Sequence, residues 1–115
     1  MSYLLLIAEP VNQRAERSES EGRVLYDRMS EFAAGLKERG LLIASESLTR
    51  SSVRVKNRDG QTSLVDGPFA EAKEMIGGFF MLDCATKEEA VEIASACPAA
   101  QWCDVEVRKI GPCWE

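Results

Sequence analysis

Side chains that could do chemistry are concentrated in the run from Asp66 to Glu74, which reads Asp-Gly-Pro-Phe-Ala-Glu-Ala-Lys-Glu. The run follows a short strand-like segment, and Pro68 both restricts Gly67 to extended conformations and starts a turn. Asp66 is therefore expected at a strand end, where its carboxylate can accept hydrogen bonds from nearby backbone N–H groups. Lys73 adds a cation seven residues later.

This run has two interpretations. In the structural one, Asp66 caps the turn, Phe69 anchors the loop in the core, and the charged residues Glu71, Lys73 and Glu74 are solvated. In the functional one, Asp66 borders a cavity, and its pKa is set by the neighbouring carboxylates and by Lys73, so that it moves a proton or orients a ligand. The residues alone favour the structural interpretation, since structural ion pairs also perturb carboxylates.

Two further charged residues are candidates for a site. Glu46 interrupts a segment of apolar and small residues, and a buried carboxylate there needs a cation such as Arg54 or Lys73. Alternatively, Glu46 lies at a strand end and is simply solvated. Arg54 is on the polar side of its predicted strand, where a solvated or interface role is favoured over ligand binding.

Length, composition and charge limit the kinds of protein that this chain can be. The chain has 115 residues, which fits one domain over residues 1–115, with 45% hydrophobic and 29% charged residues and a formal charge of −5. No basic block of the kind that neutralises nucleic-acid phosphates is visible, so direct nucleic-acid binding is not expected. The first residues have no basic region and only a short apolar run, so we expect no signal peptide, no membrane span and a cytoplasmic location.

The cysteines and the absence of histidine bear on cofactors. The four cysteines, Cys84, Cys97, Cys103 and Cys113, include no Cys-x-x-Cys pair, and the chain has no histidine. We expect reduced thiols, with Cys84 and Cys97 buried and Cys113 exposed. Because structural zinc sites usually show paired ligand spacing and no phosphate-binding glycine loop is present, no metal, nucleotide or flavin cofactor is predicted.

Hydrophobic spacing predicts the order β-α-β-β-β-β-α-β. Strand patterns are expected within residues 3–8, 41–48, 53–56, 62–66, 76–83 and 103–107, with Asp59-Gly60 forming a hairpin turn. Leu25, Met29, Phe32 and Leu36 form the apolar stripe of the first helix, and Ser18 with Glu21 suggests a capping box at its start. Thr86 begins the second helix, whose inner face is Ala90, Ile93, Ala94 and Cys97.

This order is typical of an α+β ferredoxin-like sandwich with an extra β-hairpin. Its two helices are expected on one face of the sheet. The other face then needs cover, and dimerisation sheet to sheet supplies it, which would enclose a cavity between subunits. Gly77 and Gly78 predict a bulge or a close backbone approach within the strand over residues 76–83.

The Asp66–Glu74 run, followed by Gly77-Gly78-Phe79, closely resembles the signature of the DGPF group within the YCII-related family. The opening Tyr3–Ile7 segment, the Glu46-Ser47-Leu48 step and the Cys97–Ala100 helix end with the strand that follows it are also similar to that group. The similarity covers nearly the whole chain, and a nine-residue motif is a specific signal.

The resemblance implies a ferredoxin-like dimeric α+β barrel with a pocket between sheet and loops. It also implies an association with extracytoplasmic-function sigma factors for some members, and acid–base chemistry by a histidine–aspartate pair for a few enzymes of the wider family. Because this chain has no histidine, that mechanism cannot be carried over to Asp66.

Three functions follow from these observations. The first is a homodimer that binds a small molecule near Asp66, Phe69 and Lys73, with Glu46 and Arg54 as further candidate ligands and a regulatory role linked to such a sigma factor. The second is a lyase, isomerase or dehalogenase on a small cyclic or acidic compound, with Asp66 as general base and Lys73 or Arg54 stabilising the anion. The third is a protein–protein partner of a sigma factor with a vestigial pocket.

Overall fold

The structure is a computed structural model that describes residues 2–115. It contains the predicted strand and helix order, with two short 3-10 helices added. The elements are β1 (Ser2–Pro10), η1 (Arg14–Glu16), α1 (Glu19–Glu38), β2 (Leu42–Ser47), β3 (Val53–Arg58), β4 (Gln61–Asp66), β5 (Glu74–Asp83), α2 (Lys87–Ala96), η2 (Pro98–Gln101) and β6 (Asp104–Lys109).

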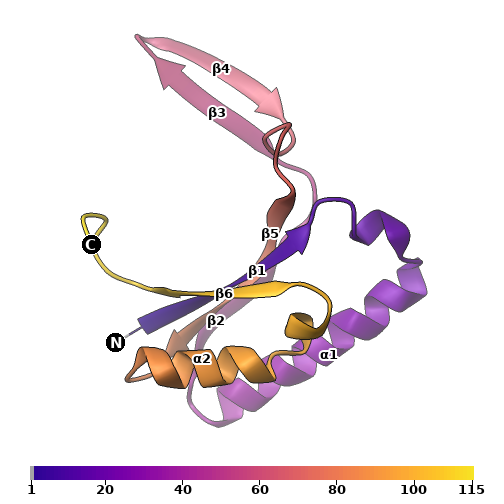
Figure 1. Ribbon diagram of the computed structural model, residues 1–115, viewed down its shortest axis with the longest axis vertical. Coiled ribbons are helices and arrows are strands. Elements are labelled where there is room, and N and C mark those ends of the chain that lie inside the picture. The colour runs from indigo at the N-terminus through magenta and orange to yellow at the C-terminus, as the bar shows by residue number, and fades with distance from the viewer. Residues whose placement is uncertain (1) are drawn as a thin grey trace.

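Four of the strands form the main sheet, in the order β2-β5-β1-β6 with every neighbouring pair antiparallel. With α1 and α2 on one side of this sheet, the arrangement is the predicted ferredoxin-like α+β fold (Figure 1). We call this sheet with its helices the body. The hairpin β3–β4 forms a separate two-stranded sheet that projects from the body, and we call it the arm.

The core lies between the main sheet and the helices. Alternate residues of β1 point into it, with Tyr3, Leu5 and Ile7 buried and the residues between them half-buried. The ring of Phe80 on β5 meets Phe32 of α1 edge to face, with the ring centroids 5.3 Å apart. The predicted inner face of α2 is confirmed, and so is that of α1 for Met29, Phe32 and Leu36. Leu25 is half-buried and lies outside this core.

Helix ends follow the local sequence. Ser18 accepts a hydrogen bond from the Glu21 N–H, and the Glu21 carboxylate accepts one from the Ser18 N–H, so the predicted capping box is present. The hydrogen bonds that the Ser18 N–H and the Ser18 hydroxyl donate to this carboxylate lower the pKa of Glu21. At α2, the Thr86 hydroxyl accepts a hydrogen bond from the Glu89 N–H, and the Glu89 carboxylate accepts one from the N–H of Ala85.

The cysteines also agree with the sequence prediction. Cys84 and Cys97 are buried, Cys113 is exposed, and all four thiols are free. Burial raises the pKa of Cys84 and of Cys97.

The strand β5 carries the predicted bulge. Ile7 lies opposite Gly78 and Ala8 opposite Ile76, which leaves Gly77 without a partner on β1. A Cβ at Gly77 would lie 2.7 Å from the Glu9 carboxyl carbon and 2.8 Å from Nη2 of Arg14. The close approach of two side chains therefore favours glycine here, because a larger residue would have to displace them.

The face of the main sheet opposite the helices carries a row of four side chains. Glu46, Phe79, Leu6 and Glu106 follow one another across β2, β5, β1 and β6 in direct register. Phe79 and Leu6 are half-buried, and the two glutamates at the edges are exposed. No element of the described chain covers this apolar centre with its acidic rim, which we call the open face (Figure 1).

The arm departs from one expectation. Val53 and Val55 alternate with polar residues, which predicts a strand with one solvated face, but both faces are solvated, since the two valines are 57% and 68% exposed. Every residue of β3 and β4 is exposed. The predicted hairpin turn is confirmed, with Asp59 and Gly60 at positive φ angles of 54° and 77°.

Among residues 2–115, no helix has both the length and the apolar composition needed to cross a membrane.

Candidate functional site

A cavity of about 720 Å³ lies between the main sheet and the N-terminal half of α1. Its apolar wall includes Ile7 and Phe80 from the sheet, Met29 from α1, and Trp102 beyond η2. The polar residues of its lining form its polar wall and come from β1, η1, the link between η1 and α1, α1 and β2, namely Glu9, Arg14, Arg17, Ser18, Glu19, Arg23, Ser30, Ser45, Glu46 and Ser47. A chamber of this size with mixed walls is typical of small-molecule sites.

The centre of the polar wall is an ion pair between Glu9 and Arg14. Glu9 is 6% exposed, and its Oε1 lies 2.5 Å from Nε of Arg14. The guanidinium also donates from Nη1 to the Leu48 carbonyl at 2.7 Å and from Nη2 to the Gly77 carbonyl at 3.2 Å. Arg14 thus neutralises a buried carboxylate and joins three chain segments, as a planar fork of donors allows.

Local sequence explains how Arg14 reaches Glu9. Pro10 ends β1, and the Gln13 N–H donates to the Pro10 carbonyl at 3.1 Å in the turn that leads into η1. The side-chain amide of Gln13 donates to the Trp102 carbonyl at 2.5 Å, which fixes this turn against the far side of the core. The chain therefore folds back, and Arg14 lies beside the end of the strand that it has just left.

The charged side chains near the Glu9–Arg14 pair differ in whether they have an ion-pair partner. Glu19 is paired with Arg23 by a contact of 3.2 Å, whereas Arg17 forms no ion pair among the residues that the structure describes. The N-terminal end of α1, with its positive partial charge, also borders the cavity. Burial, and secondarily the negative charge of Glu9, raises the pKa of the Cys103 thiol to about 11.

Of the predicted site residues, the structure brings Arg54 and Phe69 together. The guanidinium carbon of Arg54 lies 4.6 Å from the centroid of the Phe69 ring. Asp66 is the last residue of β4 and lies opposite Val53. Phe69 is 54% exposed, so the expectation that it anchors the loop in the core is wrong.

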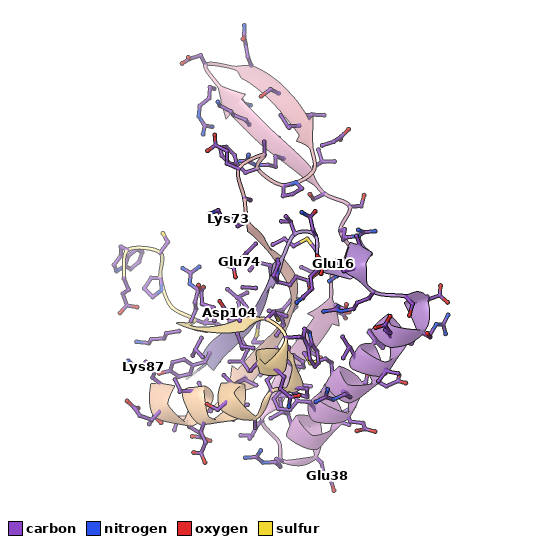
Figure 2. All side chains as sticks on the ribbon, turned by 45° about the vertical axis from the view of Figure 1, so that its right-hand side comes forward. Glu16, Glu38, Lys73, Glu74, Lys87 and Asp104 are labelled. Carbon is purple, nitrogen blue, oxygen red and sulfur yellow. The ribbon has the colours of Figure 1, made fainter. Side chains whose placement is uncertain are left out.

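Lys73 and Glu46 lie apart from that pair. Figure 2 shows Lys73 where the chain leaves the arm for β5, and its carbonyl accepts a hydrogen bond of 3.1 Å from the Val11 N–H. Lys73 also lines a smaller hollow, beside Gln13 and Glu16. Glu46 is exposed and borders the cavity, and no ion pair joins it to Arg54 or Lys73 within the described residues. Of its two interpretations, the solvated one is therefore correct.

Sequence reasoning missed Glu9 and Arg14. The available signal was the alternation of β1: Glu9 has the same parity as Leu5 and Ile7, so it belongs to the inward face. Gly77 was predicted as a bulge or a close approach, but the groups that approach it, Glu9 and Arg14, were not foreseen.

Metal binding has no visible basis in the described part of the chain. Across residues 2–115, no three cysteine or carboxylate side chains form a cluster that could hold a metal ion.

Comparison with known proteins places the chain in a family. It matches the YCII-related domain over residues 1–113. An uncharacterised protein of Rhizobium meliloti (strain 1021) is 36% identical over 78 residues, which make up 66% of this chain and 62% of that relative. The match thus spans less than two thirds of the relative's own length. Since the family match covers nearly every residue, the chain belongs to the YCII-related domain family.

Proposed function

We propose that this protein binds a small organic molecule with an apolar body and an anionic group, in the cavity between the main sheet and α1. The observation that carries the proposal is the combination of an apolar wall with the buried Glu9–Arg14 pair in a chamber of about 720 Å³. A ligand's apolar part would pack against Ile7, Met29 and Phe80.

The anionic group is assigned from the charges that remain available. Glu9 and Glu19 are already paired with arginines, which leaves Arg17 and Glu46 as the charged lining residues without an ion pair in the described chain. Arg17 precedes the N-cap of α1, whereas the Glu46 side chain belongs to the open face. Arg14 uses three N–H groups on protein acceptors, and a guanidinium has five. Together with the N-terminus of α1, these cations favour an anion at the polar wall.

The proposal includes a homodimer formed through the open face. The row of Phe79 and Leu6 between two glutamates is the kind of apolar patch that association covers. A two-fold dimer would cover the open face of both copies. This follows the dimeric α+β barrel that the DGPF-like signature implies.

The Asp66 region is the second candidate for the ligand site. Its support is the stacking of Arg54 on an exposed Phe69, which presents an aromatic ring and a cation together. Lys73 and Glu46 complete the set predicted from the sequence. Asp66→Ala is therefore tested beside the cavity variants.

An enzyme is the alternative function. A carboxylate beside a guanidinium on a cavity wall is an arrangement that can remove a proton and stabilise the resulting anion, and Glu9 with Arg14 has it. Such a lyase, isomerase or dehalogenase would act on a small cyclic or acidic compound. Asp66 remains the general base predicted from the sequence, and a pH–rate profile of Glu9→Gln and Asp66→Asn separates the two.

The biological setting is part of the same proposal. We place the protein in the cytoplasm, in a regulatory role linked to an extracytoplasmic-function sigma factor, because the DGPF-like signature implies that association. A pull-down from native cells in which no sigma factor accompanies the chain would count against this link.

The test is a thermal-shift screen against small carboxylic and phosphorylated metabolites. A ligand present at about a hundred times its dissociation constant adds about 2.7 kcal/mol, which raises Tm by several degrees. The same compounds are screened with Arg17→Ala and with Arg39→Ala, an exposed arginine outside the cavity lining that serves as the matched control. A shift lost only in Arg17→Ala supports the cavity.

The other outcomes of the screen are equally informative. A shift lost in Asp66→Ala and kept in Arg17→Ala would move the site to the base of the arm. A well-folded protein that responds to no compound in the library would contradict small-molecule binding of this class. Incubation of a hit with the protein, followed by product analysis, then separates binding from turnover.

A further inference from the structure

The arm has no partner in the described chain. Its two strands pair only with each other, and every residue in them is exposed. An isolated two-stranded hairpin is marginally stable in water, because it has no second layer against which to bury side chains. A contact from outside residues 2–115 of one copy would hold it in one conformation.

The two faces of the arm differ in character. Val55 lies directly opposite Leu64, and Val53 is two residues away on the same face. These three side chains are 57–68% exposed and form an apolar strip, which ends at Asp66, directly opposite Val53 on the same face. The opposite face carries Arg54, Lys56 and Arg58, whose cross-strand neighbours are the uncharged Val65, Ser63 and Gln61.

Charge separates the arm from the body. The arm, residues 53–66, contains three cations, Arg54, Lys56 and Arg58, against two anions, Asp59 and Asp66, which gives a formal charge of +1. Because the whole chain carries −5, the remaining residues carry −6. Two copies of this chain are therefore electrostatically complementary, arm to body, and such complementarity steers association and selects partners.

We infer that the arm of each copy docks on the body of a second copy, with the apolar strip of Val53, Val55 and Leu64 laid on the partner's open face. This inference rests on the homodimer of the proposed function and adds what the arm does in it. The open face offers an apolar centre at Phe79 and Leu6, with carboxylates on its rim.

Symmetry makes the second copy the occupant of choice. Each chain presents both an unpartnered apolar strip on a cationic arm and an uncovered apolar face on an anionic body. In a two-fold dimer the arm of each copy lies on the open face of the other copy. One type of contact, repeated by the symmetry, therefore covers both arms and both open faces. No other partner needs to be assumed for either surface.

The first experiment measures hydrogen exchange of the full-length chain by mass spectrometry, at concentrations well above and well below dimer dissociation. Peptides from residues 53–66 are expected to exchange at least about tenfold more slowly in the dimer, since docking closes an otherwise exposed hairpin. Peptides from α2, on the other side of the sheet, serve as the internal reference.

The second experiment uses a matched pair of variants. Leu64→Lys places a charge in the apolar strip, whereas Ser63→Lys places the same charge one residue earlier on the opposite face. Both positions are exposed in the monomer, so neither change disturbs the core. Sedimentation velocity should show a dimer weakened at least about tenfold by Leu64→Lys and changed less than about threefold by Ser63→Lys.

The outcomes distinguish the arm from the dimer itself. A stable dimer whose arm exchanges as fast as in the monomer, or in which both lysine variants have equal effects, would overturn the arm contact and leave the homodimer standing. A chain that is monomeric at every concentration would overturn both. Slow hydrogen exchange of the arm that appears only when a polyanion such as heparin is added would mean that its cations bind a different partner. That result also contradicts the inference.

Discussion

The body and the arm use the same strand pattern with opposite results. In β1, Leu5 and Ile7 alternate with neighbours on the other face and are buried under the helices. In β3, Val53 and Val55 alternate with Arg54 in the same way, yet both are exposed. Alternation therefore shows that a strand has an apolar face, but not whether the same chain covers that face.

The largest expected effect tests this difference directly. Leu5→Ala removes a fully buried side chain and should lower the free energy of unfolding by about 2–5 kcal/mol, because it leaves a cavity in the core. Val55→Ala should change the stability of the dissociated chain by less than about 0.5 kcal/mol. Urea unfolding monitored by circular dichroism measures both. Equal losses would mean that the arm packs on its own body.

The next prediction compares two arginines. Arg14→Met leaves the Glu9 carboxylate buried without its cation, and should cost about 3 kcal/mol of unfolding free energy. Arg54→Met removes only a cation from an exposed ring and should cost less than about 1 kcal/mol.

Glu9→Gln in the Arg14→Met background supplies the control. It removes the unpaired charge, so it should recover part of the lost stability in the same urea measurement. If the double variant is less stable than Arg14→Met alone, the cost does not come from the buried carboxylate.

A smaller effect is expected at the bulge of β5. Gly77→Ala directs a methyl group into Glu9 and Arg14, and should lower the unfolding free energy by about 1–3 kcal/mol. Gly35→Ala in α1 meets nothing within 4 Å and should raise stability by about 0.5–1 kcal/mol, because alanine favours the helix. Thermal unfolding of the two variants should therefore shift Tm in opposite directions. A neutral Gly77→Ala would show that the ion pair moves aside easily.

The smallest effect concerns pH. The pKa of the Cys103 thiol is raised to about 11, so the folded chain holds this proton while the unfolded chain, with an ordinary thiol pKa near 9, releases it. The unfolded state therefore gains from deprotonation, and stability falls as pH rises from about 9 to about 11. We expect a loss of about 1 kcal/mol after allowing for the partial exposure of the thiol. Subtracting the pH dependence of the unfolding free energy of Cys103→Ala from that of the unchanged chain isolates this loss. Superimposable profiles of the two proteins would refute the assignment of the loss to Cys103.

Much of the body could be predicted from the sequence because its signals are local. Ser18 with Glu21 predicts the start of α1, Asp59-Gly60 predicts the arm's turn, and apolar spacing predicts both helices. The site was harder, because Glu9 and Arg14 meet only after the chain reverses at Pro10, and Leu48 and Gly77 arrive from distant segments. The cavity wall is a product of long-range packing, which single-sequence patterns do not encode.

The candidate residues around Asp66 show the opposite case, in which a local sequence motif was recognised but its surroundings were not predicted. The sequence motif indicated a site in the segment from Asp66 to Glu74, which carries several charged side chains. Phe69 was expected in the core because aromatic residues are usually buried, and the arm's projection from the body removes that option. Whether Asp66 meets a ligand remains a prediction, which the screen with Asp66→Ala decides.

The base of the arm has a consequence for how this chain tolerates insertion and deletion. The Gly67 N–H donates to the Ser52 carbonyl at 2.7 Å, so the chain enters and leaves the arm at nearly the same point. The paths of β2 and β5 therefore do not depend on how long the excursion between them is. Such a junction permits the excursion to be shortened, extended or replaced by an unrelated module without changing the register of the main sheet. The arm is thus a site where new specificity can be grafted onto an unchanged scaffold.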